Sequence, residues 1–159
     1  MNDINSGASV TAAYLARRGV SAQWRVFLRA LVETLDAHLD QAGRTALMRI
    51  IGRRMAEAMP LAHCDTLAGL EAQVNDALAS AEWGFCHLAV DTEARRLVIT
   101  HAAAPAIGAG DDTDGGWIGA VMEGLYTGWL TEQPGADPAL TAEIASYVPG
   151  EAVLYYARK

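Results

Sequence analysis

The fold of this chain depends on the run Gly115-Gly-Trp-Ile-Gly-Ala-Val-Met-Glu-Gly-Leu-Tyr-Thr-Gly-Trp-Leu-Thr-Glu-Gln-Pro-Gly135. Its bulky apolar residues recur at steps of four, which predicts one helix with a broad apolar stripe. An acidic, glycine-rich loop precedes the run and Pro134 lies near its end, as is usual at the borders of a helix. The stripe consists of Trp117, Ile118, Val121, Met122, Leu125 and Trp129.

Three glycines, Gly119, Gly124 and Gly128, lie inside this predicted helix. Each glycine in a helix interior lowers stability by about 0.5–1 kcal/mol relative to alanine. We therefore expect another backbone to approach the helix closely, either from its own sheet or from a second subunit, although core packing alone is the simpler interpretation. The candidates for the core or a subunit interface are Trp117, Gly124, Leu125, Tyr126 and Trp129.

The totals indicate one domain, because 159 residues with 52 % hydrophobic composition can bury a sizeable core. No apolar run approaches the ~20 residues that cross a bilayer. The first residues show no basic start followed by an apolar segment, so we expect no secretory signal and a cytoplasmic location. Cys64 and Cys86 do not form a disulfide framework, and we interpret them as small buried hydrophobic residues.

Charge is divided unevenly along the chain. Up to Pro60, eight arginines and five acidic residues give +3. The remainder carries four basic and fourteen acidic residues, which give −10 and bring the total to −7. This division suits self-association between unlike ends or docking to a basic partner. We expect no nucleic-acid partner, because phosphate binding requires a net basic face.

The first half of the chain has the patterns of helices. Residues 1–20 form an N-terminal segment that we expect to be partly flexible, with a short amphipathic stretch before Gly19. Ser21 is expected to cap a helix that runs to about residue 41 and ends at Gly43. A second helix over residues 44–59 should pack against it as a hairpin. Asp65 or Thr66 is expected to cap a third helix.

The pattern then changes to a period of two, which predicts a β-hairpin over residues 85–90 and 97–101. Two more strands are predicted at residues 140–147 and 152–157, and the last is apolar on both faces, so we expect it to be covered on both sides. The result is an α+β domain over residues 21–159, with N-terminal helices packed on an antiparallel sheet and the glycine-containing helix inserted before the last strands. The tryptophans at 24, 83, 117 and 129 are expected to be buried in the core or in an interface.

No group of residues predicts an active site, so we expect neither an enzyme nor a cofactor. Five side chains suggest a metal, but Cys86 and His87 are strand neighbours and point to opposite faces, so we expect no metal site. His87 and His101 are interpreted as a structural cross-strand pair. The acidic loop around Asp112 lacks the spacing of a calcium loop and is expected to be solvated. The five side chains are those of His63, Cys64, Cys86, His87 and His101.

Several motifs carry a resemblance. The pattern Gly115-x-Trp117 and Val121-x-Glu123-Gly124-Leu125-Tyr126-x-x-Trp129 resembles the signature of the D subunit of bacterial cellulose synthase, a small non-catalytic protein of cellulose synthase operons. The resemblance covers roughly residues 24–157. Further matching pieces, in the same order, are Gly52-x-x-Met55, Pro60, Cys64, Thr66-Leu67, Leu70, Asn75, Leu78, Trp83-Gly84 and Leu97-x-Ile99-x-His101.

The resemblance implies a ring-forming homo-octamer built as a tetramer of dimers, which guides β-1,4-glucan chains through its passages or scaffolds the synthase complexes. Its implied partners are further copies of itself, the cellulose synthase complex with its accessory proteins, and the β-1,4-glucan chain. The family also offers a periplasmic alternative to the cytoplasmic location. Because the N-terminal segment is implicated in lining the passages, the candidates for glucan or partner contact are Asn2, Asp3, Asn5, Tyr14 and Arg17.

Two other classes of function stay open. One is a small-molecule-binding or sensor domain, with its pocket between the sheet and the glycine-containing helix. The other is an enzyme with an unfamiliar site around His87 and His101.

Overall fold

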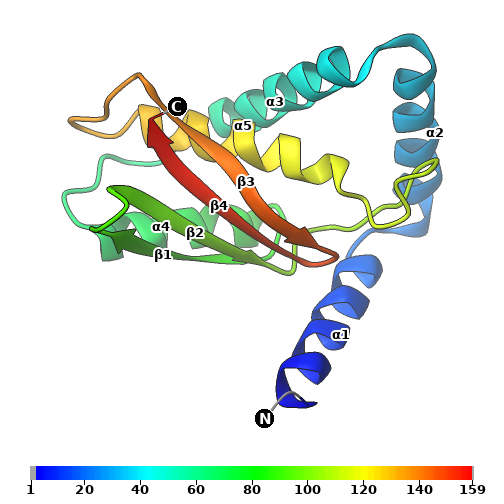
Figure 1. Ribbon diagram of the computed structural model, residues 1–159, viewed down its shortest axis with the longest axis horizontal. Coiled ribbons are helices and arrows are strands. Elements are labelled where there is room, and N and C mark those ends of the chain that lie inside the picture. The colour runs from blue at the N-terminus through cyan, green and yellow to red at the C-terminus, as the bar shows by residue number, and fades with distance from the viewer. Residues whose placement is uncertain (1–2, 159) are drawn as a thin grey trace.

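The computed structural model describes the backbone of residues 3–158, and the side chains of residues 10, 11 and 13–158. It confirms the predicted α+β class, with helices and a four-stranded antiparallel sheet (Figure 1). The elements are α1 (Asp3–Arg18), α2 (Ala22–His38), α3 (Gln41–Ala58), α4 (Leu67–Ser80), β1 (Phe85–Asp91), β2 (Arg96–Ala102), α5 (Trp117–Thr131), β3 (Leu140–Val148) and β4 (Glu151–Arg158).

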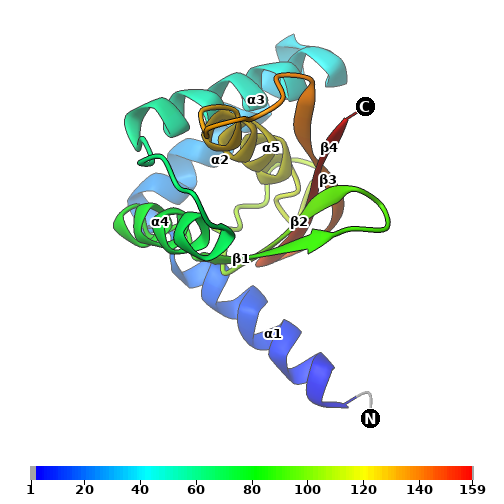
Figure 2. The same cartoon turned by 90° about the vertical axis from the view of Figure 1, so that its left-hand side faces the viewer.

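The sheet has the strand order β1-β2-β4-β3, and every neighbouring pair is antiparallel. Figure 2 shows α3, α4 and α5 together on one side of it, while α1 projects away from the body. Leu88, Ile99 and Leu154 point to the helical side and are buried. Val153 and Tyr155 point to the other side and are only half-buried, so the expectation that the last strand is covered on both sides is wrong within residues 3–158.

Helix α5 lies at the centre of the core, where Met122, Leu125 and Tyr126 are fully buried. Among the described residues, its closest neighbour is α3 rather than the sheet. A Cβ atom at Gly52 of α3 would overlap the carbonyl oxygen of Val121, and one at Gly124 of α5 would overlap that of Arg49. The two backbones are therefore in direct contact, which explains glycine at these two positions.

Polar side chains of helices close both edges of the sheet. On α4, Asn75 bonds both the amide and the carbonyl of Cys86 in β1, at 2.7 and 3.0 Å. On α5, Thr127 accepts from the amide of Ala142, and Glu123 accepts from the amide of Ile144, each at 2.9 Å. These amides belong to the edge strands β1 and β3, so another chain cannot pair with them there.

Glu123 also joins α5 to α3. Its carboxylate is nearly buried and lies 2.6 Å from the Nε of Arg49. A buried carboxylate is stable only when it is paired and hydrogen-bonded, and Glu123 satisfies this requirement with one partner on α3 and one on β3. A single side chain thus connects three elements.

Side-chain caps set the starts of three helices. Thr66, one of the two predicted candidates, accepts from the amide of Gly69 at 3.1 Å and caps α4. Ser21 caps α2, also as predicted. The predicted helix end at Gly43 is wrong, because Asp40 accepts from the Gly43 amide at 2.8 Å and starts α3. Helix α2 therefore ends at His38, and Gly43 belongs to the first turn of α3.

The predicted hairpin of the first two long helices is also wrong. Figure 1 shows α2 and α3 meeting at a corner, where the chain turns sharply between them. The buried residues of α3, which are Met48, Gly52 and Ala56, lie on the side that packs on α5. Because the backbone of α3 contacts α5 at Gly52, α3 packs on α5 rather than along α2. Helix α2 therefore has few neighbours among the described residues.

The side chain of His101 lies fully buried in β2. Its Nε2 is 2.7 Å from the carbonyl oxygen of Trp83, which can only accept, so Nε2 carries the proton. Its Nδ1 then accepts from the hydroxyl of Tyr126 at 2.6 Å. Burial lowers the pKa of His101 from 6.5 to about 4, and the ring is neutral at pH 7.

We expect Gly124→Ala to lower the free energy of unfolding by about 3 kcal/mol or more, because the added methyl group forces two helix backbones apart. The melting temperature should fall by roughly 6–12 °C. Gly116→Ala is the matched control, because that position has φ −61° and the nearest atoms to its added Cβ are 3.6 Å away. Equal melting temperatures for the two variants would contradict the helix crossing.

The buried His101 predicts a loss of stability in acid. Between pH 6.5 and about 4 the unfolded chain binds a proton at this residue while the folded chain does not, so stability falls across that window and is unaffected above it. The shift in the pKa of His101 corresponds to about 3 kcal/mol in the free energy of unfolding, of which about 2 kcal/mol should be lost by pH 5. Urea unfolding at pH 7 and at pH 5 measures this loss. His101→Gln should show a smaller difference between the two pH values, and an unchanged difference would contradict this role.

Candidate functional site

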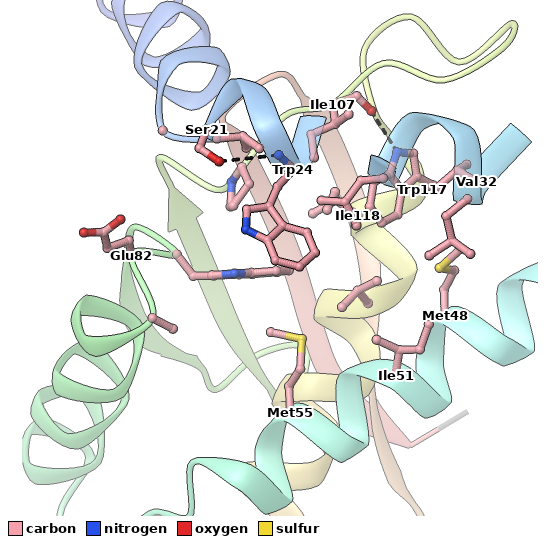
Figure 3. Close-up of a pocket in the computed structure, with 18 of the residues that line it drawn as sticks. Ser21, Trp24, Val32, Met48, Ile51, Met55, Glu82, Ile107, Trp117 and Ile118 are labelled. Atoms are coloured by element: carbon pink, nitrogen blue, oxygen red, sulfur yellow. Dashed lines mark hydrogen bonds between the residues drawn. The ribbon is translucent and has the colours of Figure 1, made fainter. Parts of the chain in front are cut away.

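A groove with a volume of about 420 Å³ opens between α2, α3 and α5 (Figure 3). Almost all of its lining side chains are apolar, and they come from these three helices and from the segments before β1 and α5. This groove lies on the side of α5 away from the sheet. A second cavity, of about 330 Å³, lies between α5 and β3, where the sequence leads us to expect a pocket, and Thr127, Thr141 and Ala142 are among its lining residues. From α2 the groove receives Trp24, Leu28, Leu31, Val32 and Leu35.

The α2 wall follows from helical periodicity. Trp24, Leu28, Leu31 and Leu35 are three or four residues apart, which places them on one face. This face would be buried if another helix covered it, but Trp24 is 56 % exposed. The predicted burial of Trp24 is therefore wrong within the part of the chain that the structure describes. Its ring packs edge-on against Phe27, which is also exposed.

The opposite wall is firmly held. The indole nitrogen of Trp117 donates to the carbonyl oxygen of Ile107 at 2.8 Å, which fixes the ring beside the groove (Figure 3). Val32, Met48 and Val121 form a small buried cluster next to it. Because the polar atom of Trp117 is already bonded, this wall can offer only carbon to whatever enters.

Glu82 is the one charged residue among the described residues that line the groove. It is exposed and lies near the rim (Figure 3), and its φ of 56° is unusual for a residue other than glycine. The hydroxyl of Ser21 is used in the cap of α2. The groove therefore suits an apolar occupant that carries one positive or hydrogen-bond-donating group at its edge.

Helix α1 projects from the body (Figures 1 and 2), and Gly19, Val20 and Ser21, which follow it, line the groove. Only its last turns are anchored among the described side chains, since Ala16 is buried and its carbonyl accepts from the amide of Ala106 at 3.2 Å. Nearer its start Val10, Tyr14 and Leu15 are exposed. An apolar helix face without cover is typical of a surface that binds another molecule.

The structure places the predicted N-terminal contact residues as follows. Asn2 lies outside the described residues, and Asp3 and Asn5 belong to α1 at positions whose side chains are not described. Tyr14 is exposed and accepts from Arg18 at 2.9 Å. Arg17 lies 4.0 Å from Asp114 of the acidic loop.

The other predicted candidates lie in the body of the protein. Gly124, Leu125, Tyr126 and Trp129 are buried in its core, and Trp117 is half-buried beside the groove. Sequence reasoning missed the groove itself. The signal for it was the apolar face of α2, which needed a partner that α3 does not supply.

The side chains that suggested chemistry do not converge. The strand register pairs His87 with Thr100 and His101 with Cys86, so the predicted pair of histidines is wrong and the two rings lie on opposite faces of the sheet. His87 is exposed and lies 3.0 Å from Glu71. An enzyme site shared by His87 and His101 is excluded by this geometry. Burial raises the pKa of the Cys86 thiol to about 11, which makes it a poor nucleophile.

The acidic loop serves α5. Asp112 accepts from the amides of Gly116 and Trp117, both at 2.9 Å, so its carboxylate stabilises the start of the helix and is not simply solvated. Among residues 3–158, no cluster of three or more His, Cys, Asp or Glu side chains has the proximity to hold a metal ion. Within the same residues, every helix is too short or too polar to cross a membrane.

Comparison with known proteins identifies a family that this chain matches. The model of the cellulose synthase D subunit family matches residues 10–157, which include the groove and α5. A cellulose synthase operon protein D of Komagataeibacter sucrofermentans is 37 % identical over 142 residues, covering 84 % of this chain and 89 % of that protein. Two proteins of the same name from Komagataeibacter xylinus are 36 % and 35 % identical with the same coverage. The match extends through nearly the whole described fold, and this chain belongs to the cellulose synthase D subunit family.

Proposed function

We propose that this protein is a non-catalytic accessory subunit of bacterial cellulose biosynthesis that works as a homo-octameric ring, a tetramer of dimers. The ring guides and organises the export and crystallisation of β-1,4-glucan chains, or it scaffolds the synthase complexes. Membership of the cellulose synthase D subunit family supports the role in cellulose biosynthesis. The exposed and closed surfaces of one copy support the assembly.

The observation that carries the proposal is a set of exposed apolar side chains in the first two helices, which we call the N-terminal apolar surface. It consists of Val10, Tyr14, Leu15, Trp24, Phe27 and Leu31, each at least 40 % exposed. Burying one such side chain fully contributes about 1.5–3 kcal/mol. Six of them together supply ample free energy for association, and large exposed apolar patches mark interaction sites.

The closed sheet edges direct where subunits can join. Asn75 and Glu71 occupy amides of β1, while Thr127 and Glu123 occupy amides of β3. Subunits therefore cannot assemble by extending the sheet from one copy into the next at these positions. Assembly through helix faces remains, which agrees with the position of the N-terminal apolar surface.

A passive role also agrees with where the unusual ionisable groups lie. Cys86, His101, Tyr126 and Tyr147 have strongly shifted pKa values. The first three are buried in the core, where His101 is bonded to Tyr126 and to the backbone, and the half-buried Tyr147 donates its hydroxyl to the backbone before α5. These groups therefore serve the fold. Guiding a polymer or organising a complex requires surfaces and no chemical step.

A second candidate function is the binding of a small apolar ligand. The volume of the groove, about 420 Å³, lies within the range of roughly 300–1,000 Å³ that small-molecule sites occupy. A ligand retained through purification, detected by mass spectrometry of the extracted protein, would favour this function over a ring.

The proposal predicts the mass of the purified protein. Light scattering behind a sizing column should give a stable species of eight times 16.9 kDa over a wide range of concentrations. A protein that stays monomeric at every concentration would contradict the ring. In cells, removal of the protein should leave glucan synthesis active but disorder the cellulose that is exported, as judged by fibre diffraction.

We also predict that Trp24→Asp breaks the assembly into smaller species. The carboxylate would have to be buried in an apolar contact, at a cost of several kcal/mol. Because Trp24 is exposed in the single copy, the melting temperature at low concentration should change little. Val90→Asp is the matched control, since Val90 is 61 % exposed on β1, away from this surface. Equal masses for both variants and the unaltered protein would refute the assignment of the surface.

A further inference from the structure

We propose that α1 of one copy lies in the groove of a second copy, with Tyr14 inserted beside Trp24 and Arg18 facing Glu82. This inference rests on the proposed self-association. It identifies the two surfaces that touch when two copies associate, which are the outer side of α1 and the groove. Both surfaces belong to the same chain, so two copies can exchange their helices in a closed, two-fold contact.

The first argument is that the outer side of α1 is uncovered by the described residues of its own chain. Its last turn is fixed to the body at Ala16, while Val10 and Tyr14, four residues apart on one side of the helix, face outward. Val10 is 68 % exposed. The anchored end holds the helix pointing away from the body (Figures 1 and 2), so this side is presented to another molecule.

The second argument is the shape and chemistry of the groove. Its volume of about 420 Å³ corresponds to roughly 14 water molecules at about 30 Å³ each, enough for an aromatic ring and neighbouring aliphatic side chains. Carbon atoms line it on both walls, which suits the apolar side of a helix. The ring of Trp24 lies among the lining side chains (Figure 3) and is 56 % exposed, so it can pack against an incoming tyrosine.

The third argument is complementary charge. Glu82 is the one charged residue lining the groove, and the described part of the chain contains no salt bridge to it within 4.0 Å. Arg18 follows Tyr14 by one helical turn, donates to its hydroxyl and lies 5.7 Å from its ring centre. A tyrosine that enters the groove therefore brings a guanidinium group to the rim, where Glu82 can accept it.

A photo-crosslink tests the contact directly. The full-length protein with p-benzoylphenylalanine in place of Tyr14 is mixed with an equal amount of isotope-labelled protein and irradiated. We expect crosslinks between light and heavy chains that map to α2 and to the segment around Trp83. Crosslinks within one chain, or between chains at other elements, would overturn the proposal.

Matched variants test its energetics by the concentration dependence of the mass. Val10→Asp and Tyr14→Asp should each raise the dissociation constant about 30-fold or more, as the loss of a central contact does. Val26→Asp is the control, because Val26 is 73 % exposed on α2 but does not line the groove, and it should change the constant less than about threefold.

Exchanging the charges of Arg18 and Glu82 tests the proposed ion pair. Arg18→Glu and Glu82→Arg should each weaken association about tenfold, and the double variant should recover most of the loss, whereas Arg54→Glu should have no effect. Failure of the double variant to recover would overturn the proposal. If the unaltered protein assembles but Tyr14→Asp leaves the dissociation constant unchanged and the crosslinks map elsewhere, this contact alone is refuted. If the protein never assembles, the ring is refuted as well.

Discussion

The crossing of α3 and α5 at Gly52 and Gly124 is the constraint on which the rest of the structure depends. Without side chains at these positions the two backbones touch. That distance lets Arg49 reach Glu123 at 2.6 Å, and Glu123 in turn accepts from the edge strand β3 at Ile144. One close approach thus fixes a helix, a buried ion pair and the last sheet edge. Because a buried carboxylate needs all its partners, loosening the crossing would weaken each of the other contacts.

The same crossing accounts for the groove. A helix can bury only one apolar face against one neighbour, and α3 uses its buried face on α5. Helix α2 then turns away at the corner, although the connection of two residues would suit a hairpin. It buries Val32 against α3 and α5 but leaves Trp24 and Leu31 exposed. The exposed Trp24 and the cavity beside it are therefore consequences of how the core is built. The proposed association surface lies where the fold leaves a helix partly unpaired.

Local sequence patterns were sufficient to predict many of the helices and strands. The alternation around Cys86 predicted the hairpin, Thr66 predicted the start of α4, and the apolar steps from Trp117 predicted α5. Asp40 shows where local reasoning fails, since both an aspartate cap and Gly43 can mark a border and only the hydrogen bond selects between them. The pairing of α3 with α5 and the exposure of Trp24 are properties of the tertiary arrangement. Periodicity states that a face is apolar, and it cannot state what covers that face.

The occupied edges of the sheet and the exposed apolar residues of α2 limit the ways in which this protein can bind another molecule. Strand amides at both sheet edges are taken by side chains of α4 and α5, which limits recognition through backbone pairing. In the core, His101 is bonded to Tyr126 and to the carbonyl of Trp83, so these groups add rigidity. The proposed contact uses an apolar groove with one carboxylate at its rim and a projecting helix with an arginine one turn from a tyrosine. Neither surface is covered by the described residues of one copy, and each has what the other lacks. The proposed association between copies would therefore use surfaces that the packing of the single copy leaves open.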